Sequence, residues 1–211
     1  MSSTTNSLTP EELGSAAQRD RRKRILDATI SLATQGGFDA VQMRAVAEQA
    51  DVALGTLYRY FPSKIHLLVS VLAQQFEVAG ENLARKAVPG DTAADRVMFV
   101  LGRTTQTLQR EPNLTEALTR AFMFADASVA QEIDVVAAHV RRMLLLAMRE
   151  PGTPADVPEP TEEEVAITKV IGDVWLASLV QWVTGRASAH DVATSLDVAV
   201  RLLLREPRPL A

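Results

Sequence analysis

The stretch Asp51-Val-Ala-Leu-Gly-Thr-Leu-Tyr-Arg-Tyr-Phe-Pro-Ser-Lys64 decides how this chain folds. It predicts a short helix that ends at Pro62, because proline lacks a backbone donor. A helix shorter than roughly 12 residues is not stable alone in water, so other helices must hold it. Leu57 and Phe61, spaced i and i+4, are expected to face those helices. The polar and aromatic side chains left outside are Thr56, Tyr58, Arg59 and Tyr60.

A second short helix is expected directly upstream, over residues 42–49, with Met43, Val46 and Ala47 buried. The three residues 50–52 between the two helices are enough only for a turn. Two short helices joined in this way form a helix-turn-helix unit, whose second helix commonly enters the major groove of DNA. The pattern therefore indicates a nucleic-acid-binding module.

The rest of the chain also has helical periodicity, so the predicted fold class is all-α with about nine helices. A first helix from about Ala16 should end at Gly36-Gly37, because glycine accepts the left-handed conformation. A long helix over 63–86 is expected to join this module to the remainder of the chain. Further helices are expected over residues 92–110, 113–125, 128–149, 161–184 and 188–204. Three pairs have capping-box spacing: Asn113 with Glu116, Thr161 with Glu164, and, more weakly, Ser188 with Asp191.

The domain organisation follows from the breaks in this pattern. Residues 1–15 are polar and aperiodic and are expected to form a disordered arm. Residues 16–62 are then the helix-turn-helix domain, 63–205 a larger helical domain, and 206–211 a tail. The proline-rich stretch 150–160 predicts an exposed loop.

Charge and composition narrow the class of protein. The net charge of the 211 residues is −4, but residues 1–70 carry eight Lys/Arg and seven Asp/Glu, and five basic residues lie between Arg19 and Arg24. The first module is thus the basic part of an acidic chain. There is no cysteine, and no apolar run approaches the roughly 20 residues of a membrane span. We expect a cytoplasmic protein without disulfides and without a membrane partner.

The sequence contains no motif that indicates catalysis or metal binding. His66, His139 and His190 are far apart and lack metal-ligand spacing. We also find neither a phosphate-binding glycine loop nor a nucleophile with its base. No enzyme activity, metal or cofactor is therefore expected, and an enzyme or a helical scaffold is the rival to a DNA-binding protein.

Several segments together resemble the DNA-binding domain of TetR-type transcriptional repressors, namely Arg24-Ile-Leu-Asp-Ala, Gly36-Gly-Phe, Arg44-Ala-Val-Ala-Glu and Gly55-Thr-Leu-Tyr-Arg-Tyr-Phe-Pro-Ser-Lys. The resemblance implies a homodimer that binds double-stranded operator DNA and is released by a small-molecule inducer. The chain departs from the family pattern at Val41 and Ala53. These repressors often have Thr or Ser there, so the resemblance does not carry over those two phosphate contacts.

The candidate DNA-binding residues are Gln42, Arg44, Leu54, Gly55, Thr56, Tyr58, Arg59, Tyr60 and Lys64. Gln42 and Arg44 are placed to reach phosphates or a base edge, and Arg59 suits a bidentate contact with guanine. The family places Tyr58, Tyr60 and Lys64 at DNA, although the tyrosines could instead pack on the module surface. For Leu54 the two lines of reasoning differ: its spacing predicts burial in the core, whereas the resemblance implies a contact in the DNA groove.

Motifs beyond the first module resemble one group within this family, including Leu114-Thr-Glu-Ala, Phe124-Ala-Asp-Ala-Ser, Asp173-Val-Trp-Leu and Leu196-Asp-Val-Ala-Val-Arg-Leu-Leu. That group represses cholesterol-catabolism genes and responds to coenzyme A thioesters of steroid side-chain intermediates. The resemblance implies the same regulon and a steroid acyl-CoA inducer for this chain. A TetR-type regulator of another regulon, such as multidrug efflux, is the alternative.

The candidate inducer pocket is built from large, adaptable apolar side chains, because ligand sites between helices are mostly apolar. These are Met98, Phe99, Leu101, Phe122, Met123, Phe124, Met143, Leu146 and Trp175. The same residues at helical spacing are also typical of an ordinary core. Four arginines are candidates for the phosphates of an acyl-CoA or for solvated surface: Arg103, Arg120, Arg141 and Arg142.

The predicted helix 161–184 is apolar on more than one face, and the excess predicts a partner. Together with 188–204 it would form a four-helix dimer interface. The candidates are Val170, Val174, Leu179, Trp182, Val192, Leu196, Val200 and Leu203. A fully buried core helix would have a similar pattern.

Overall fold

The computed structural model describes residues 10–85, 87–150 and 159–204, and all regular structure within these ranges is helical. The elements are α1 (Pro10–Ala40), α2 (Met43–Gln49), α3 (Leu54–Tyr60), α4 (Lys64–Ala84), α5 (Ala93–Arg110), α6 (Pro112–Met123), a 3-10 turn (Ala127–Val129), α7 (Ala130–Met148), α8 (Glu162–Val183) and α9 (Ala189–Leu203). The predicted all-α fold is confirmed.

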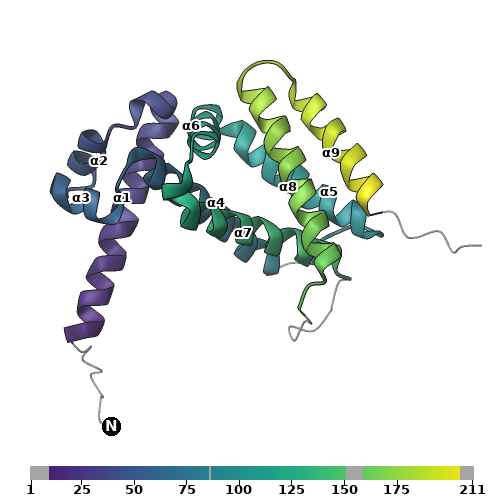
Figure 1. Cartoon of the computed structure of the whole chain (residues 1–211), viewed down its shortest axis with the longest axis horizontal. Coiled ribbons are helices and arrows are strands. Elements are labelled where there is room, and N and C mark those ends of the chain that lie inside the picture. The colour runs from purple at the N-terminus through teal and green to yellow at the C-terminus, as the bar shows by residue number, and fades with distance from the viewer. Residues whose placement is uncertain (1–9, 86, 151–158, 205–211) are drawn as a thin grey trace, which may run out of the picture.

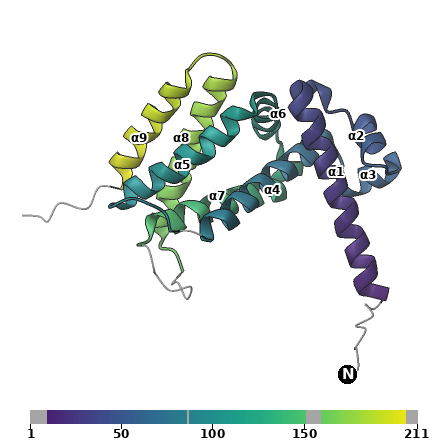
Figure 2. The same ribbon diagram turned by 180° about the vertical axis from the view of Figure 1, so that it is seen from behind.

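The helices form two regions joined by α4 (Figure 1). Helices α1, α2 and α3 pack together at one end, and the antiparallel pair α8 and α9 lies at the other end. Helix α6 lies between α1 and the body, as the view from behind also shows (Figure 2). The module that carries the helix-turn-helix is thus docked on the body through α1, α4 and α6.

The chain ends differ from the prediction. Helix α1 begins at Pro10, so the disordered arm expected over residues 1–15 is wrong for residues 10–15. Residues 1–9, the predicted tail 206–211 and most of the predicted loop 150–160 lie outside the described residues. At the other end of α1, Gly36 (φ −149°) and Gly37 (φ 66°) leave the helical conformation, as predicted.

The turn between α2 and α3 is held by a residue with positive φ. Asp51 has φ 52°, a left-handed conformation that aspartate tolerates better than most side chains. The chain then enters α3, where Leu57 and the following Phe61 are almost fully buried and belong to the same hydrophobic core as Ile25 and Leu26 of α1. The prediction that these two residues fasten the short helix is confirmed.

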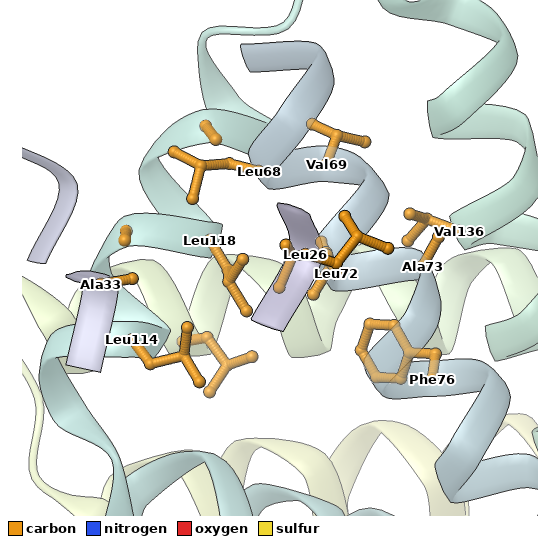
Figure 3. Packing of buried hydrophobic residues seen from close by; sticks show 14 of the residues in the cluster. Leu26, Ala33, Leu68, Val69, Leu72, Ala73, Phe76, Leu114, Leu118 and Val136 are labelled. Carbon is orange, nitrogen blue, oxygen red and sulfur yellow. The ribbon is translucent and has the colours of Figure 1, made fainter. Parts of the chain in front are cut away.

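The first half of α4, from His66 to Phe76, is largely buried because α1, α6 and α7 pack against this helix. Leu68, Leu72 and Phe76 of α4 meet Leu118 of α6 and Val136 of α7 in the core (Figure 3). Full burial of each such side chain contributes about 1.5–3 kcal/mol relative to exposure. This packing makes α4 a rigid connection between the two regions.

Two of the three predicted capping boxes are present. Thr161 with Glu164 and Ser188 with Asp191 exchange side-chain and backbone hydrogen bonds at the starts of α8 and α9. The prediction for Asn113 with Glu116 is wrong, because α6 begins with Pro112 and is preceded by Glu111. Both polar side chains point instead to the end of α1, where they have another role.

Candidate functional site

The outward face of α3 carries most of the predicted DNA contacts. Tyr58 is 47% exposed, Leu54 is 40% exposed, and Gly55 and Arg59 are exposed as well. Leu54 therefore does not belong to the core, which Leu57 and Phe61 already fill. The other two predicted residues of this helix, Thr56 and Tyr60, are half-buried.

Gly55 has no packing reason within the described chain. A Cβ added there would meet no heavy atom of it within 4 Å. Glycine weakens a helix by up to about 1 kcal/mol relative to alanine. The surface above Gly55 is open, so another molecule can approach the backbone closely at this point.

The other predicted contacts surround α3. Gln42 is exposed and directly precedes α2. Arg44 is also exposed, and its Nε lies 3.2 Å from Glu48 Oε1. Such a surface pair is worth only about 0–1 kcal/mol, so Arg44 can exchange it for a phosphate. Lys64, at the start of α4, is half-buried.

Part of the basic run on α1 supports the module itself. Arg24 Nη1 donates to the carbonyl oxygen of Ala50 at 2.8 Å and lies 3.9 Å from the Asp51 carboxylate. It thereby ties α1 to the turn between α2 and α3. The Arg22 guanidinium lies 5.7 Å from the centre of the Phe61 ring. Sequence spacing gave no indication of these supporting roles.

A cluster at the end of α1 joins the module to α6, and no local sequence pattern indicates it. We call it the Phe38 clasp, formed by Phe38, Lys64, Asn113, Glu116 and Arg120. The Phe38 backbone N–H donates to Glu116 Oε2 at 2.9 Å. Asn113 Nδ2 donates to the carbonyl oxygen of Thr34 at 3.1 Å, which caps the end of the α1 helix. The capping-box spacing of Asn113 and Glu116 thus serves a tertiary contact.

Two cations lie close to the Phe38 ring. Lys64 Nζ is 3.7 Å from the ring centre and the Arg120 guanidinium is 4.5 Å from it. Burial lowers the pKa of the Lys64 ammonium, although the Asp39 carboxylate opposes this shift. Lys64 belongs to the first turn of α4 and Arg120 to α6, so the clasp connects three helices.

His66 makes a second link between the start of α4 and the body. Its ring is buried, with Nδ1 2.9 Å from Ser63 Oγ and Nε2 3.0 Å from the carbonyl oxygen of Ser128. Each ring nitrogen of His66 thus lies within hydrogen-bond distance of a protein oxygen, and we interpret its role as structural. In the described part of the chain, no group of three or more His, Asp or Glu side chains could hold a metal ion.

The described part of the body contains space for a ligand, including the two cavities that follow. Cavity 1, of about 720 Å³, opens between α4, α5 and α7 and has polar and basic groups in its wall, among them Gln75, Asn82, Arg85 and Arg103. Cavity 2, of about 290 Å³, lies between α4, α6, α7 and α8 and is mainly apolar. Leu72, Phe76 and Leu108 line both cavities and so form the partition between them.

The partition is braced by an aromatic pair. The Phe76 and Trp175 rings are 5.6 Å apart and edge-on to each other. Trp175 is held in turn by its indole N–H, which donates to Thr105 Oγ1 at 2.9 Å.

The structure brings only part of the predicted inducer pocket together. Phe99 and Met143 line cavity 1, and Phe122 and Trp175 line cavity 2. The other five predicted residues line neither cavity: Leu101 is buried in the core, Met98 and Leu146 are half-buried, and Met123 and Phe124 are exposed. Of the four candidate arginines, Arg103 lines cavity 1, Arg141 lines cavity 2, Arg120 belongs to the clasp, and Arg142 is exposed.

The predicted dimer residues divide between two faces. Val192, Leu196, Val200 and Leu179 are buried within the chain itself, so a second copy cannot reach them. The prediction that these four lie at a dimer interface is corrected. Val170 is 44% exposed, whereas Val174, Trp182 and Leu203 are half-buried. Val198 and Leu202 of α9, 54% and 55% exposed, were missed.

The dimer residues of α9 were assigned to the wrong face because this helix has two apolar stripes with the same spacing. One stripe packs inward and the other outward, and periodicity cannot assign them.

Helix α8 is long and apolar enough to cross a membrane by length and composition, and only 28% of its most apolar window is buried. It begins with Glu162, Glu163 and Glu164, and Lys169 pairs with Asp173 at 2.6 Å on its surface. We interpret α8 as an incompletely covered helix beside α9.

Comparisons with known proteins agree with this architecture. Residues 25–71 match the family described as bacterial regulatory proteins, tetR family, and residues 90–203 match the tetracyclin repressor-like C-terminal domain. The chain is 55% identical to the HTH-type transcriptional repressor KstR of Mycolicibacterium smegmatis over 93% of each protein.

Solved structures show the same fold. A TetR transcriptional regulator from Rhodococcus sp. RHA1 superposes with a TM-score of 0.79 and 34% identity, covering 89% of this chain and 97% of that one. Thermus thermophilus FadR, a TetR-family repressor in complex with lauroyl-CoA, superposes with a TM-score of 0.65 and 20% identity, covering 90% and 99%.

Proposed function

The chain belongs to the TetR family of bacterial transcriptional regulators, and we propose that it represses genes of steroid catabolism and leaves its operator when a steroid acyl-CoA binds. Regulators of this family bind operator DNA, dimerise and bind small molecules. The relatives are repressors and not enzymes, which confirms the predicted class. The observation that carries the choice of regulon is the 55% identity to KstR over 93% of the chain.

We assign DNA binding to residues 16–62 and ligand binding and dimerisation to residues 63–205. The exposed face of α3, with Leu54, Gly55, Tyr58 and Arg59, suits the major groove, where Arg59 can pair with a guanine and Leu54 can meet a thymine methyl. Gln42 and Arg44 lie at the start of α2 and suit the phosphate backbone. The remaining proposed contacts are Thr56, Tyr60 and Lys64.

We assign the dimer interface to the outer face of α8 and α9. Val170, Val198 and Leu202 are exposed there, and Ala166 and Ala177 leave room for close approach of another helix. Pairing with the same face of a second copy would give a four-helix bundle and bury these apolar side chains. The half-buried Val174, Trp182 and Leu203 can complete the contact.

The two cavities suit a ligand with two chemically different halves. Cavity 2 is apolar and suits a rigid ring system, whereas cavity 1 carries Arg85 and Arg103, which suit the phosphates of coenzyme A. A thioester that spans both cavities requires Phe76 to move, since this side chain lies in the partition. The fold of the lauroyl-CoA-bound FadR shows only that this architecture can house an acyl-CoA.

The clasp offers a route from ligand to DNA. Leu118 and Phe122 of α6 line cavity 2, whereas Asn113, Glu116 and Arg120 of the same helix hold the end of α1. A ligand that shifts α6 or α4 therefore changes the position of α3 relative to the body. Such coupling requires the ligand to bind one arrangement better than the other, and it acts in both directions.

The direct test is a titration of the protein bound to an operator fragment selected from random DNA. Steroid acyl-CoA thioesters, free sterols, coenzyme A alone and cationic drugs are added in turn while fluorescence anisotropy follows release of the DNA. We expect release by the steroid thioesters and not by coenzyme A or the drugs. Release by the drugs alone would indicate an efflux regulator, and no selection of any DNA fragment would contradict the repressor itself.

A further inference from the structure

The buried wall of cavity 2 carries a hydroxyl that the described chain does not bond. Thr119 lines this cavity and is only 6% exposed, yet its hydroxyl has no hydrogen-bond partner in the described part of the chain. Its oxygen is not among the fully enclosed polar atoms without a partner in the described chain, which are Gln74 Oε1 and Gln109 Nε2, so it reaches the open space of the cavity. A hydroxyl that faces a cavity in this way can donate to, or accept from, a ligand atom that enters it.

The other threonines of the same cavity do not share this feature. Thr115 Oγ1 donates to the carbonyl oxygen of Leu108 at 2.6 Å, and Thr168 Oγ1 donates to that of Val165 at 2.9 Å. Both residues also line cavity 2 and are at least as buried as Thr119. The chain thus satisfies two hydroxyls in this wall and leaves the third available to whatever enters.

The surroundings of Thr119 define what it can bind. Its neighbours in the wall include Leu118, Phe122, Leu72 and Phe76, so a ligand meets mainly apolar surface there. Thr119 lines cavity 2 and not cavity 1, where Arg85 and Arg103 lie. The charged residues of this lining, Arg141, Lys169 and Asp173, are exposed, so they lie toward solvent. A buried wall with one unbonded hydroxyl matches a ligand that is apolar except for one oxygen at the end remote from its charged group.

We propose that Thr119 recognises a ketone or hydroxyl oxygen on the ring system of the ligand, at the end of the skeleton remote from the acyl-CoA group. This inference rests on the proposed steroid acyl-CoA inducer and adds the feature by which the site discriminates among such thioesters. A site with a positioned hydrogen-bonding group rejects an analogue that lacks the matching atom, because the group stays unpaired.

Thr119 also lies where recognition can be transmitted. It follows Glu116 by three residues and directly precedes Arg120, and both of these hold Phe38 at the end of α1. An oxygen bound by Thr119 therefore acts on the turn of α6 whose other side holds the DNA-binding module.

The test compares 3-oxocholanoyl-CoA with cholanoyl-CoA, two thioesters that differ by one ring ketone. Operator release is measured for the native protein and for Thr119→Val, which replaces the hydroxyl with a methyl of similar size. The native protein should release its operator at a roughly fivefold lower concentration of the ketone than of cholanoyl-CoA. This ratio corresponds to the net contribution of about one hydrogen bond. In Thr119→Val the two thioesters should act equally.

Two further variants separate recognition from structure. Thr119→Ser keeps the hydroxyl and should keep the preference, whereas Thr168→Val removes a hydroxyl that is already bonded and should leave the preference unchanged. Equal responses of the native protein, or a preference that survives in Thr119→Val, would overturn the assignment of Thr119 alone. If neither thioester releases the operator, the proposed inducer class is wrong and this inference fails with it.

Discussion

Helices α3 and α8 each expose a face that the chain does not cover, and the chemistry of the two faces is opposite. Helix α3 has seven residues and exposes Tyr58 and Arg59 beside an open Gly55. Helix α8 has 22 residues and exposes Ala166, Val170 and much of its apolar surface. A polar, cationic face fits a charged nucleic acid, whereas an apolar face fits a second protein surface.

The difference also shows why both faces are needed. One short helix reads too few base pairs to define a site, so two copies must be held at a fixed distance. The α8–α9 face would set that distance, about 34–36 Å or a multiple of it between the two reading helices. Specific DNA binding therefore needs both faces. Because they lie on different helices, mutations can alter one without the other.

The largest effect is expected from removing the polar face of α3. Tyr58→Ala combined with Arg59→Ala should weaken operator binding roughly a thousandfold or more, since each good base contact contributes about 1–3 kcal/mol and a dimer loses each contact twice. Anisotropy with labelled operator measures this loss. Arg142→Ala, at an exposed arginine of α7, is the matched control and should bind normally. Normal binding by the double variant would remove α3 from the interface.

The next effect comes from placing charge on the apolar face. Val198→Glu with Leu202→Glu should give a monomer in analytical ultracentrifugation, because two buried carboxylates would oppose pairing. Operator affinity should fall roughly a hundredfold through loss of bivalent binding. Val135→Glu, at an exposed valine of α7, should stay dimeric. A dimeric double variant would show that another surface forms the interface.

A smaller effect tests whether the body communicates with α3 through the Phe38 clasp. Phe38→Leu keeps apolar volume but removes the ring that Lys64 and Arg120 contact, which should cost about 1–2 kcal/mol of stability. Operator affinity without inducer should change little, whereas the inducer should release less DNA. Phe124→Leu, at an exposed phenylalanine of α6's end, serves as the control. An unchanged inducer response would place the coupling elsewhere.

The smallest effect concerns the start of α9. Ser188 donates backbone and side-chain hydrogen bonds to Asp191 and lowers the pKa of that carboxyl. Its stabilising contribution is therefore present above the ordinary pKa, near 4, and is lost as the pH falls through the lower folded value. Asp191→Asn should slightly lower the melting temperature at pH 7 and behave like the native protein at about pH 2.

The control for this variant is Asp134→Asn, at an exposed carboxylate of α7. It should leave the melting temperature at pH 7 unchanged. A difference between Asp191→Asn and the native protein that persists at low pH would contradict the role of the charge at the start of α9.

Local patterns determined much of this protein. The helical periods, the Gly36-Gly37 end of α1 and the proline after Phe61 fix the helices, because each acts within a few residues. The stretch from Asp51 to Lys64 likewise shows that α3 is short, held by Leu57 and Phe61, and functional on its other side. These conclusions needed no knowledge of distant contacts.

The tertiary structure decided which faces meet. The two stripes of α9 are equally apolar, and only packing shows that Leu196 points inward and Leu202 outward. Asn113 and Glu116 have the spacing of a cap but hold the end of α1, more than 70 residues away. The free hydroxyl of Thr119 depends on every neighbour around it. Periodicity indicates which face of a helix is apolar or polar, because it depends on residues a few positions apart. The surface that packs against that face is formed by residues far away in the sequence, so only the tertiary structure shows it.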